Sequence, residues 1–353
     1  MRRHRRTAAA LTGAAVLLTT LVACGTDESA GTDGSTDEAT AGDTGELTVY
    51  SGRNEELIDP LIARMEEATG LDITVRYGDT AELAAALMEE GDRTAADLFI
   101  AQDAGALGAL SREGLLRELP AGTLEEVEPA FRGSADDWIG ISGRARVVVW
   151  NAENVEESEL PTDYRELNDA RWEGRVGYAP TNASFQSFVT ALRVLEGEDA
   201  ALEWLTDLRE HGEVYERNGA ILDAVNAGEI DLGLINHYYW FAKAAEEGEE
   251  NLDARLHFLS GGDPGSLINV AGVGVTARGD GEEAALKAVD FLLSEEAQLY
   301  FAEETKEYPL AAGVTSPVEG LPPLESIEAP DIDLTDLDSL ERTLELLREA
   351  GMV

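Results

Sequence analysis

The chain has 353 residues, and its 71 acidic against 26 basic side chains give a formal net charge of −45. Such a charge would repel a phosphate backbone, which excludes nucleic acid as a partner. The acidic residues are spread along the whole sequence, as expected for a hydrated surface suited to salty surroundings. Cys24 is the only cysteine, so an internal disulfide is excluded.

The first residues have the pattern of an export signal. Several arginines precede an uncharged apolar stretch from Thr7 to Ala23, which is too short for a comfortable membrane span. The stretch ends in a lipobox-like Leu-Val-Ala-Cys sequence, so we expect residues 1–23 to be a cleaved lipoprotein signal and Cys24 to carry the lipid. Residues 24–45 are small, polar and acidic and predict a disordered tether. We therefore expect an extracytoplasmic protein anchored to the outer face of the cytoplasmic membrane.

The remaining chain alternates strand and helix patterns. Strands separated by helices of this length predict an α/β fold with parallel sheets, whose binding loops lie at the carboxyl ends of the strands. No transmembrane span is expected after the signal. The predicted strands are 46–50, 71–77, 97–101, 144–150 and 268–276, and the predicted helices are 55–69, 80–90, 281–302 and 336–350, with a helix-rich segment from 103 and a second strand–helix series over 174–245.

Two adjacent tyrosines, Tyr238 and Tyr239, stand where a strand pattern gives way to a helix pattern. Two neighbouring phenols at such a junction can turn both oxygens toward one point. Phenolate is a hard oxygen donor, and Fe(III) displaces its proton despite an ordinary pKa near ~10. Taken without their surroundings, however, two such rings are better explained as packing aromatics.

Several segments of the mature chain resemble the ferric-iron-binding solute receptors of ABC importers, in order and with similar spacing. They are LTVYSGRNEE at 47–56, EEGDRTAADLFIAQDAGAL at 89–107, SGRARVVVWN at 142–151, GRVGYAPTNASFQSFVTALR at 174–193, NGAILDAVNAGEIDLGLINHYYW at 218–240, GGDPGSLINVAGVGV at 261–275 and EYPLAAGV at 307–314. The resemblance implies a two-lobed type II periplasmic-binding-protein-like fold, in which each lobe is a mixed, mostly parallel sheet flanked by helices.

The same resemblance implies where the lobes begin and end. Residues 46–147 and 272–315 correspond to the N-lobe, and residues 148–271 to the C-lobe. Hinge strands are expected near 144–151 and 268–276, and residues 316–353 form a C-terminal helical segment that packs on the lobes.

By this resemblance Tyr238 and Tyr239 are iron ligands. Two phenolates leave positive charge on Fe(III), and one branch of the family balances it with a bound phosphate or carbonate. Exposed N–H groups at a helix start suit such an anion. From the residues alone, Asn182 and Ser184 are better explained as helix-capping residues. The matching anion-binding positions here are Asn182, Ala183, Ser184, Asn218 and Asn236.

Some family positions differ in this chain. Asn54 stands where one branch has a histidine ligand and Gln102 where it has a glutamate, and neither amide is a strong ligand for Fe(III). Asp103 offers a carboxylate as a further metal or closure contact, although its better explanation is an N-cap. Arg53 is a candidate anion partner, with an exposed surface arginine as the equal alternative.

Three further positions bear on the ligand set. Phe185 occupies the place of a third tyrosine that another branch uses. Tyr178 lies nearby in sequence, but its strand position favours packing. His237 precedes the tyrosine pair, and we expect it to point away from Tyr238 and to be structural.

The expected function is capture of Fe(III) without catalysis, lobe closure, and delivery by a monomeric receptor to a membrane ABC permease. The closest alternative is the same fold binding another metal, an anion or a small organic molecule. A secreted hydrolase with paired carboxylates is a further alternative. The sequence contains no nucleophile elbow, zinc motif or phosphate loop that would favour it.

Overall fold

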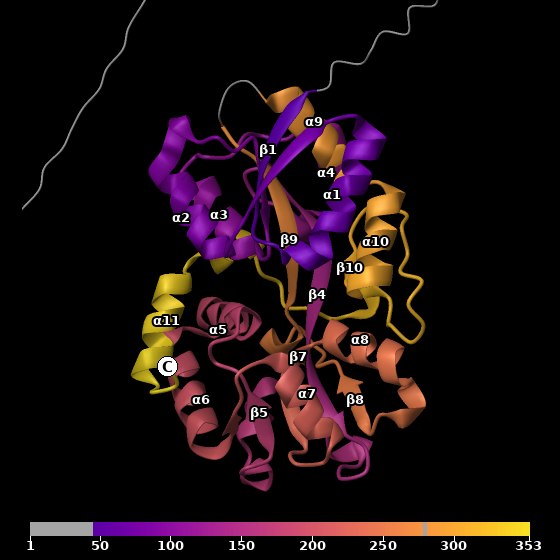
Figure 1. Cartoon of the computed structure of the whole chain (residues 1–353). Helices are drawn as coiled ribbons and strands as arrows, with labels where there is room; N and C mark the ends of the chain where they lie inside the picture. The colour runs from indigo at the N-terminus through magenta and orange to yellow at the C-terminus, as the bar shows by residue number, and fades with distance from the viewer. Residues whose placement is uncertain (1–44, 278–280) are drawn as a thin grey trace, which may run out of the picture. The chain divides into compact units, whose positions relative to one another are not determined.

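The computed structural model describes residues 45–277 and 281–353 (Figure 1). The predicted signal, the tether up to residue 44 and the lipidation site Cys24 lie outside the described residues. Six of the predicted elements are reproduced within one residue at each end: the strands over 46–50, 71–77, 97–101 and 268–276 and the helices over 55–69 and 80–90. The predicted helix over 336–350 begins later, at Leu340. None of the described helices is both long enough and apolar enough to cross a membrane.

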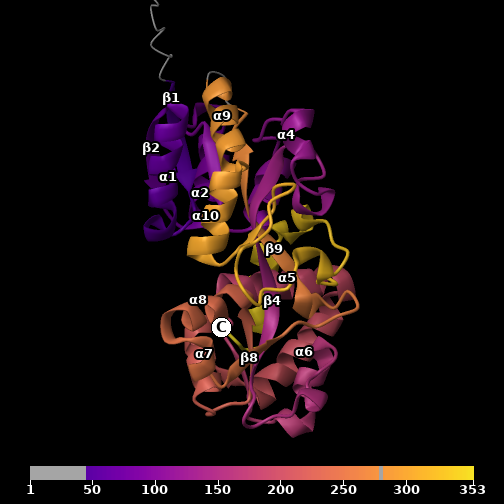
Figure 2. The same ribbon diagram turned by 90° about the vertical axis from the view of Figure 1, so that its right-hand side faces the viewer.

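The first sheet contains the N-terminal strands. β1 (Glu46–Ser51) lies between β2 (Asp72–Tyr77) and β3 (Leu98–Ala101), and both pairs are parallel. β9 (Ile268–Val275) pairs antiparallel with β3, and the long β4 (Trp138–Asn151) pairs antiparallel with β9. The short β10 (Tyr308–Pro309) pairs with β4. One face of the first sheet is covered by α1 (Glu55–Thr69), α9 (Glu282–Leu292) and α10 (Glu295–Thr305), and the other by α2 (Thr80–Glu90) and α3 (Ala104–Arg112) (Figures 1 and 2). The short helix α4 (Ala121–Glu125) also belongs to this part of the chain.

The second sheet has the order β4–β7–β5–β6. β5 (Val176–Tyr178) is parallel to β6 (Glu213–Val214) and to β7 (Leu232–Asn236), whereas β4 runs antiparallel to β7 and to β8 (Ala254–His257). Separate apolar clusters cover its two faces. One cluster contains buried side chains of α5 (Ala183–Glu196) and α6 (Glu198–His211), and the other contains those of α7 (Asn218–Asn226) and α8 (His237–Glu247).

β4 is the strand that belongs to both sheets. Its residues up to Ala145 pair with β9 in the first sheet, and from Arg146 onward it pairs with β7 in the second. β9, in contrast, stays in the first sheet from Ile268 onward. The chain therefore crosses between the two sheets a second time at Leu267. The Leu267 carbonyl accepts the N–H of Arg146 at 2.9 Å. The strand pairing thus changes just before β9, and the predicted lobe boundary between 271 and 272 stays a prediction.

Local chemistry explains several helix ends. Asn54 caps α1 by accepting the N–H of Glu56, and Gly70 ends α1 with a φ of 69°, a conformation that favours glycine. The predicted helix over 281–302 is wrong as a single element, because α9 ends at Leu292 and the Ser294 side chain caps the start of α10. The strand pattern at 254–257 was not recognised in the sequence.

The C-terminal segment packs on helices of both sheets. A 3-10 turn, Leu334–Asp338, lies against α3, where Gly105 and Gly108 allow a close backbone approach. The following helix α11 (Leu340–Glu349) lies against α5 and α6. Arg193 of α5 donates to the Ser339 carbonyl at 3.2 Å and to Thr343 Oγ1 at 2.9 Å. The segment therefore holds the two groups of helices together.

A buried ion pair joins Arg53, in the loop after β1, to Glu307, which follows α10 and Lys306. Arg53 Nη2 lies 3.1 Å from both carboxylate oxygens of Glu307, and both side chains are almost fully buried. Burial by itself raises the pKa of Glu307, but Arg53, Arg144 and the Ser142 hydroxyl outweigh it and hold the pKa below its usual value. Glu307 is therefore ionised in the folded protein at neutral pH.

The approach of the 3-10 turn to α3 predicts a clash at Gly108. A Cβ there would lie 2.4 Å from the Thr335 carbonyl oxygen, whereas a Cβ on Gly122 of α4 would meet nothing within 4 Å. We expect Gly108→Ala to lower the free energy of unfolding by about 1–3 kcal/mol. The control Gly122→Ala should be neutral or stabilising by up to ~1 kcal/mol. Urea unfolding of both variants checks this, and equal stabilities would refute the close contact.

The Arg53–Glu307 pair predicts a pH-dependent stability. Glu307→Gln leaves Arg53 buried without its counter-ion and should cost about 3–5 kcal/mol at pH 7. Because the pKa of Glu307 is lowered in the folded state, the pair's contribution is complete above its ordinary pKa of 4.5 and is lost as the pH falls through the folded pKa. The difference between parent and variant should therefore shrink on acidification.

The control for this prediction is Glu282→Gln. It breaks the Arg117–Glu282 pair at 2.7 Å, in which Glu282 is half exposed, and it should cost less than ~1 kcal/mol. Urea unfolding at neutral and acid pH measures both differences. A Glu307→Gln deficit that grows toward low pH would contradict the assignment.

Candidate metal-binding site

A cavity of about 110 Å³ contains the two tyrosines and is lined from both sheets. It lies where β3, β5 and β7 end, as expected for strands that carry binding loops at their carboxyl ends. One wall comes from residues after β3, and the other from the starts of α5 and α8. Its lining residues are Gln102, Asp103, Arg144, Arg146, Asn182, Ala183, Ser184, Ser187, Asn236, Tyr238, Tyr239, Leu267 and Asn269.

The tyrosine pair lies where the sequence pattern predicted a strand-to-helix junction. β7 ends at Asn236, α8 begins at His237, and the rings of Tyr238 and Tyr239 stack with centroids 4.4 Å apart and an interplanar angle of 26°. Burial, and then the neighbouring Tyr239, raise the pKa of Tyr238 above its usual value. Its hydroxyl is therefore protonated at neutral pH unless a strongly polarising cation displaces the proton.

The start of α5 forms a polar cluster in the same cavity. Asn182 caps the helix, its Oδ1 accepting the Ser184 N–H at 3.0 Å and the Ser184 hydroxyl at 2.6 Å. Asn218 Nδ2 donates to Ser184 Oγ at 3.0 Å, although Asn218 itself does not line the cavity. The capping interpretation of Asn182 is confirmed, and Ala183, Ser184 and Asn236 line the cavity. Their role toward an anion stays a prediction.

Two lining arginines were not singled out from the sequence. Arg144 and Arg146 are 5% and 2% exposed and stand two residues apart on β4, so both side chains point to the same face. Their signal in the sequence is a pair of charged residues at alternate positions of a strand that is otherwise apolar. Such a pattern indicates a functional site, because a buried charge is costly unless something compensates it.

Arg146 has no carboxylate partner among the described residues. Its Nη1 donates to Ser184 Oγ and its Nη2 to the Leu234 carbonyl, each at 3.1 Å, while its Nε has no partner. The guanidinium lies 5.6 Å from the ring centroid of Phe185. Burial lowers the pKa of Arg146 to about 9, and the nearby tyrosines oppose that shift. The site thus holds a buried cation that would favour phenolate over phenol.

Arg53 does not line the cavity, in contrast to the prediction that it contacts an anion. Its Nη2 is held by Glu307, and its Nη1 donates to the side-chain oxygen of Gln102 at 3.0 Å. The physical reason is that the buried Glu307 carboxylate pairs with the Arg53 guanidinium and so compensates its charge. The positive charge at the cavity comes from Arg144 and Arg146 instead.

The residues predicted to add metal or closure contacts take separate places. Asn54 is exposed, caps α1 and is not part of the cavity lining. Gln102 lines the cavity, and its backbone carbonyl accepts from Arg144. Asp103 also lines it and caps α3, accepting the Ala106 N–H at 3.3 Å, as favoured from the sequence. Burial raises the pKa of Asp103.

The oxygen donors of the cavity side chains are two phenols, several amides, two serine hydroxyls and one carboxylate. Over residues 45–277 and 281–353 no three His, Cys, Asp or Glu side chains gather in a metal-binding arrangement. A transition metal preferring nitrogen or sulfur is poorly served here, whereas a hard trivalent cation suits phenolate oxygens. The geometry therefore fits a hard cation together with a negatively charged co-ligand.

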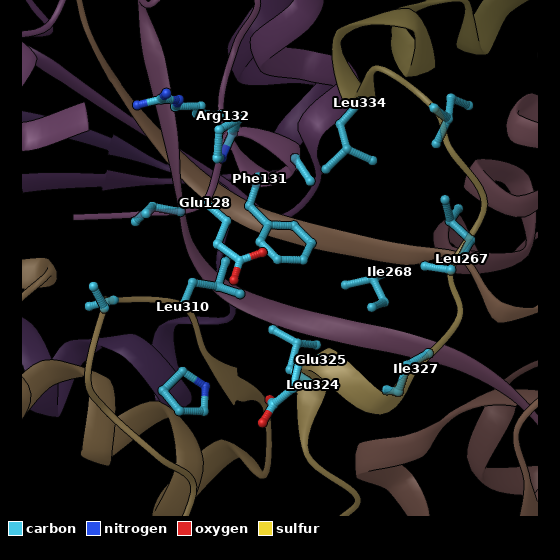
Figure 3. Close-up of a pocket in the computed structure, with 18 of the residues that line it drawn as sticks. Glu128, Phe131, Arg132, Leu267, Ile268, Leu310, Leu324, Glu325, Ile327 and Leu334 are labelled. Atoms are coloured by element: carbon cyan, nitrogen blue, oxygen red, sulfur yellow. The ribbon is translucent and has the colours of Figure 1, made fainter. Parts of the chain in front are cut away.

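A second, larger cavity of about 1020 Å³ is shown in Figure 3, and Leu267 belongs to the lining of both cavities. Phe131, Leu310 and Leu324 contribute apolar surface, and Glu128 and Glu325 also line it (Figure 3). It contains neither tyrosine of the pair. The smaller cavity is therefore the candidate site, despite its size.

Comparison with known proteins agrees with this geometry. The chain is 38% identical over 309 residues to the major ferric iron-binding protein of Neisseria meningitidis serogroup A, covering 87% of this chain and 93% of that protein. Iron-bound HitA from Pseudomonas aeruginosa has a similar structure, with a TM-score of 0.79, 35% identity, and coverage of 87% of this chain and 99% of that one.

The Trichodesmium protein IdiA (FutA), solved in complex with iron and citrate ligands, is also similar. Its TM-score is 0.76 at 26% identity, with coverage of 88% of this chain and all (100%) of that chain. The sequence profile of the bacterial extracellular solute-binding protein family matches residues 93–333. The chain accordingly belongs to the bacterial extracellular solute-binding proteins, and it has their two-lobed type II fold.

Proposed function

We propose that this protein is an extracellular receptor that captures Fe(III) between its two lobes and delivers it to an ABC permease. The observation that carries the proposal is the stacked pair Tyr238 and Tyr239 in a cavity lined from both sheets. The Neisseria relative is named a ferric iron-binding protein, and the Pseudomonas structure is iron-bound, which supports the same cargo here. Binding and release of an ion, with no bond made or broken in a substrate, is the activity that these residues suit.

Charge balance supports a second, anionic ligand. Two phenolates neutralise two of the three charges of Fe(III), and Arg146 adds another buried positive charge. A doubly charged anion such as phosphate or carbonate would compensate both. The start of α5 offers N–H groups and the Ser184 hydroxyl beside Arg146 Nη1. We therefore assign the anion to the surface formed by Asn182, Ala183, Ser184 and Arg146, with Asn218 and Asn236 as supports.

The remaining coordination would come from the facing wall. Gln102 and Asp103 follow β3 and line the cavity opposite the starts of α5 and α8. Movement at the β4 crossing would bring this wall nearer to bound iron, so affinity would depend on closure as well as on ligand bonds. Asn54 would make no contact with iron, because its side chain caps α1 and is not part of the cavity lining.

The proposal extends to the setting of the receptor. We propose that a monomer is tethered to the membrane through Cys24 and docks on its permease after loading. The family to which the chain belongs comprises extracellular solute-binding proteins, which supports this placement.

An organic anion is the second candidate cargo. Arg144 and Arg146 would bind a carboxylate or phosphate solute in the same cavity without metal. Such a solute has no need of two adjacent phenols, which is why iron is preferred. The two cargoes give different spectra, because only a ferric–phenolate bond produces a visible charge-transfer band.

The test is a visible absorbance titration of the purified protein with ferric citrate, with carbonate and phosphate supplied. We expect a saturable tyrosinate-to-iron band in the parent. Tyr238→Phe combined with Tyr239→Phe should abolish it and weaken iron binding by at least about 100-fold, more than the usual loss for a supporting residue. Tyr77→Phe is the matched control, because the Tyr77 hydroxyl binds Asp59 at 3.0 Å outside the cavity. Absence of a band in the parent would refute the iron assignment.

A further inference from the structure

His237 opens α8 immediately before the two tyrosines, and its side chain is completely buried (0% exposed). Its Nδ1 accepts the backbone N–H of Ala145 at 3.1 Å, and its Nε2 lies 2.9 Å from the backbone carbonyl oxygen of Lys306. A carbonyl oxygen only accepts, so the proton of the neutral ring is on Nε2, which donates to Lys306. Both nitrogens are thus engaged.

The first of these bonds reaches the place where β4 changes sheets. Ala145 is the last residue of β4 to pair with β9, and the next residue, Arg146, pairs with Asn236 of β7. His237 directly follows Asn236. The imidazole therefore takes up the N–H of β4 at the crossing between the sheets, the position about which the lobes would move.

The second bond reaches a segment of the first lobe. Lys306 ends α10 with a φ of 60°, a left-handed conformation uncommon for a residue with a side chain. Glu307 follows it and holds Arg53, which in turn donates to Gln102 in the opposite wall of the cavity. Tyr308 packs on the His237 ring with centroids 4.7 Å apart. The ring is held from several sides.

We infer that His237 is a positioning residue for cargo binding, which ties the tyrosine-bearing start of α8 to the Lys306–Glu307 segment and thereby to the Gln102 wall. This inference rests on the proposed function, and it extends that function to a side chain outside the cavity lining. The hydrogen-bonded path from His237 through Lys306, Glu307 and Arg53 to Gln102 joins the two walls across the β4 crossing.

Two substitutions separate the two bonds. In His237→Asn the side-chain oxygen takes the place of Nδ1 and still accepts from Ala145, but the side chain is too short to reach Lys306. In His237→Gln the amide nitrogen reaches the place of Nε2 and donates to Lys306, whereas the acceptor toward Ala145 is lost. The positioning role depends on the Lys306 bond, so Gln should rescue what Asn loses. His211→Asn, on α6 and outside the cavity lining, is the matched control.

The experiment measures ferric citrate binding by the charge-transfer band, with competition by excess citrate for affinity. We expect His237→Asn to bind iron about fivefold more weakly with a displaced absorption maximum, since one net hydrogen bond of ~1 kcal/mol corresponds to about that factor. His237→Gln should stay within about twofold of the parent, and His211→Asn should match it. Parental affinity and band in both His237 variants, with only lowered unfolding temperatures, would reduce His237 to packing and overturn the inference.

A measurement on the unaltered protein covers the case in which the variants do not fold. By linkage, a bond that assists cargo binding is itself strengthened by cargo. Loading with Ga(III), a diamagnetic substitute for Fe(III), should slow solvent exchange of the His237 Nε2 proton about fivefold in ¹⁵N NMR. An unchanged exchange rate would overturn the inference. If the parent protein gives no charge-transfer band, the proposed function itself is refuted. If the parent and His237→Asn both bind iron normally, only the inference about His237 is refuted.

Discussion

The arrangement of the site depends on the passage of β4 from one sheet into the other. Because side chains alternate along a strand, Arg144 and Arg146 share one face and line the cavity, while Ala145 between them offers its N–H to His237. The same crossing places the residues that follow β3 opposite the starts of α5 and α8. One strand thus supplies the positive charge of the cavity and the backbone N–H that His237 accepts beneath the tyrosines, and it crosses between the sheets at the place where we propose the hinge.

Electrostatics then decide what the cavity can hold. Arg146 is buried without a carboxylate among the described residues, and burial lowers its pKa. Tyr238 is also held in the wrong state for a metal ligand, because burial raises its pKa. Burying the charge of Arg146 costs free energy, and so does removing the proton of the buried Tyr238. Both costs are relieved together when a trivalent cation replaces the phenol protons and an anion pairs with the guanidinium. Each feature alone would destabilise the protein, and the two are compatible in one ferric site.

Features encoded locally could be predicted from the sequence. The bounds of α1 follow from helical spacing and Gly70, the cap at Asn182 from a side-chain acceptor before an apolar helix, and the tyrosine junction from a strand pattern ending at Asn236. The partner of Arg53 could not be predicted, because Glu307 lies 254 residues away and nothing near Arg53 indicates it. The break between α9 and α10 was missed because a serine within an apolar-periodic stretch is also compatible with a continuous helix.

If one iron ion bonds to both adjacent phenols, a crystal structure of the iron-loaded protein will show it. The iron anomalous signal locates the metal without assumptions about its ligands. We expect a single peak bonded to the hydroxyl oxygens of Tyr238 and Tyr239, with density for a small anion between iron and the start of α5. An iron peak away from this pair, or a loaded protein whose tyrosine oxygens contact only solvent, would contradict it.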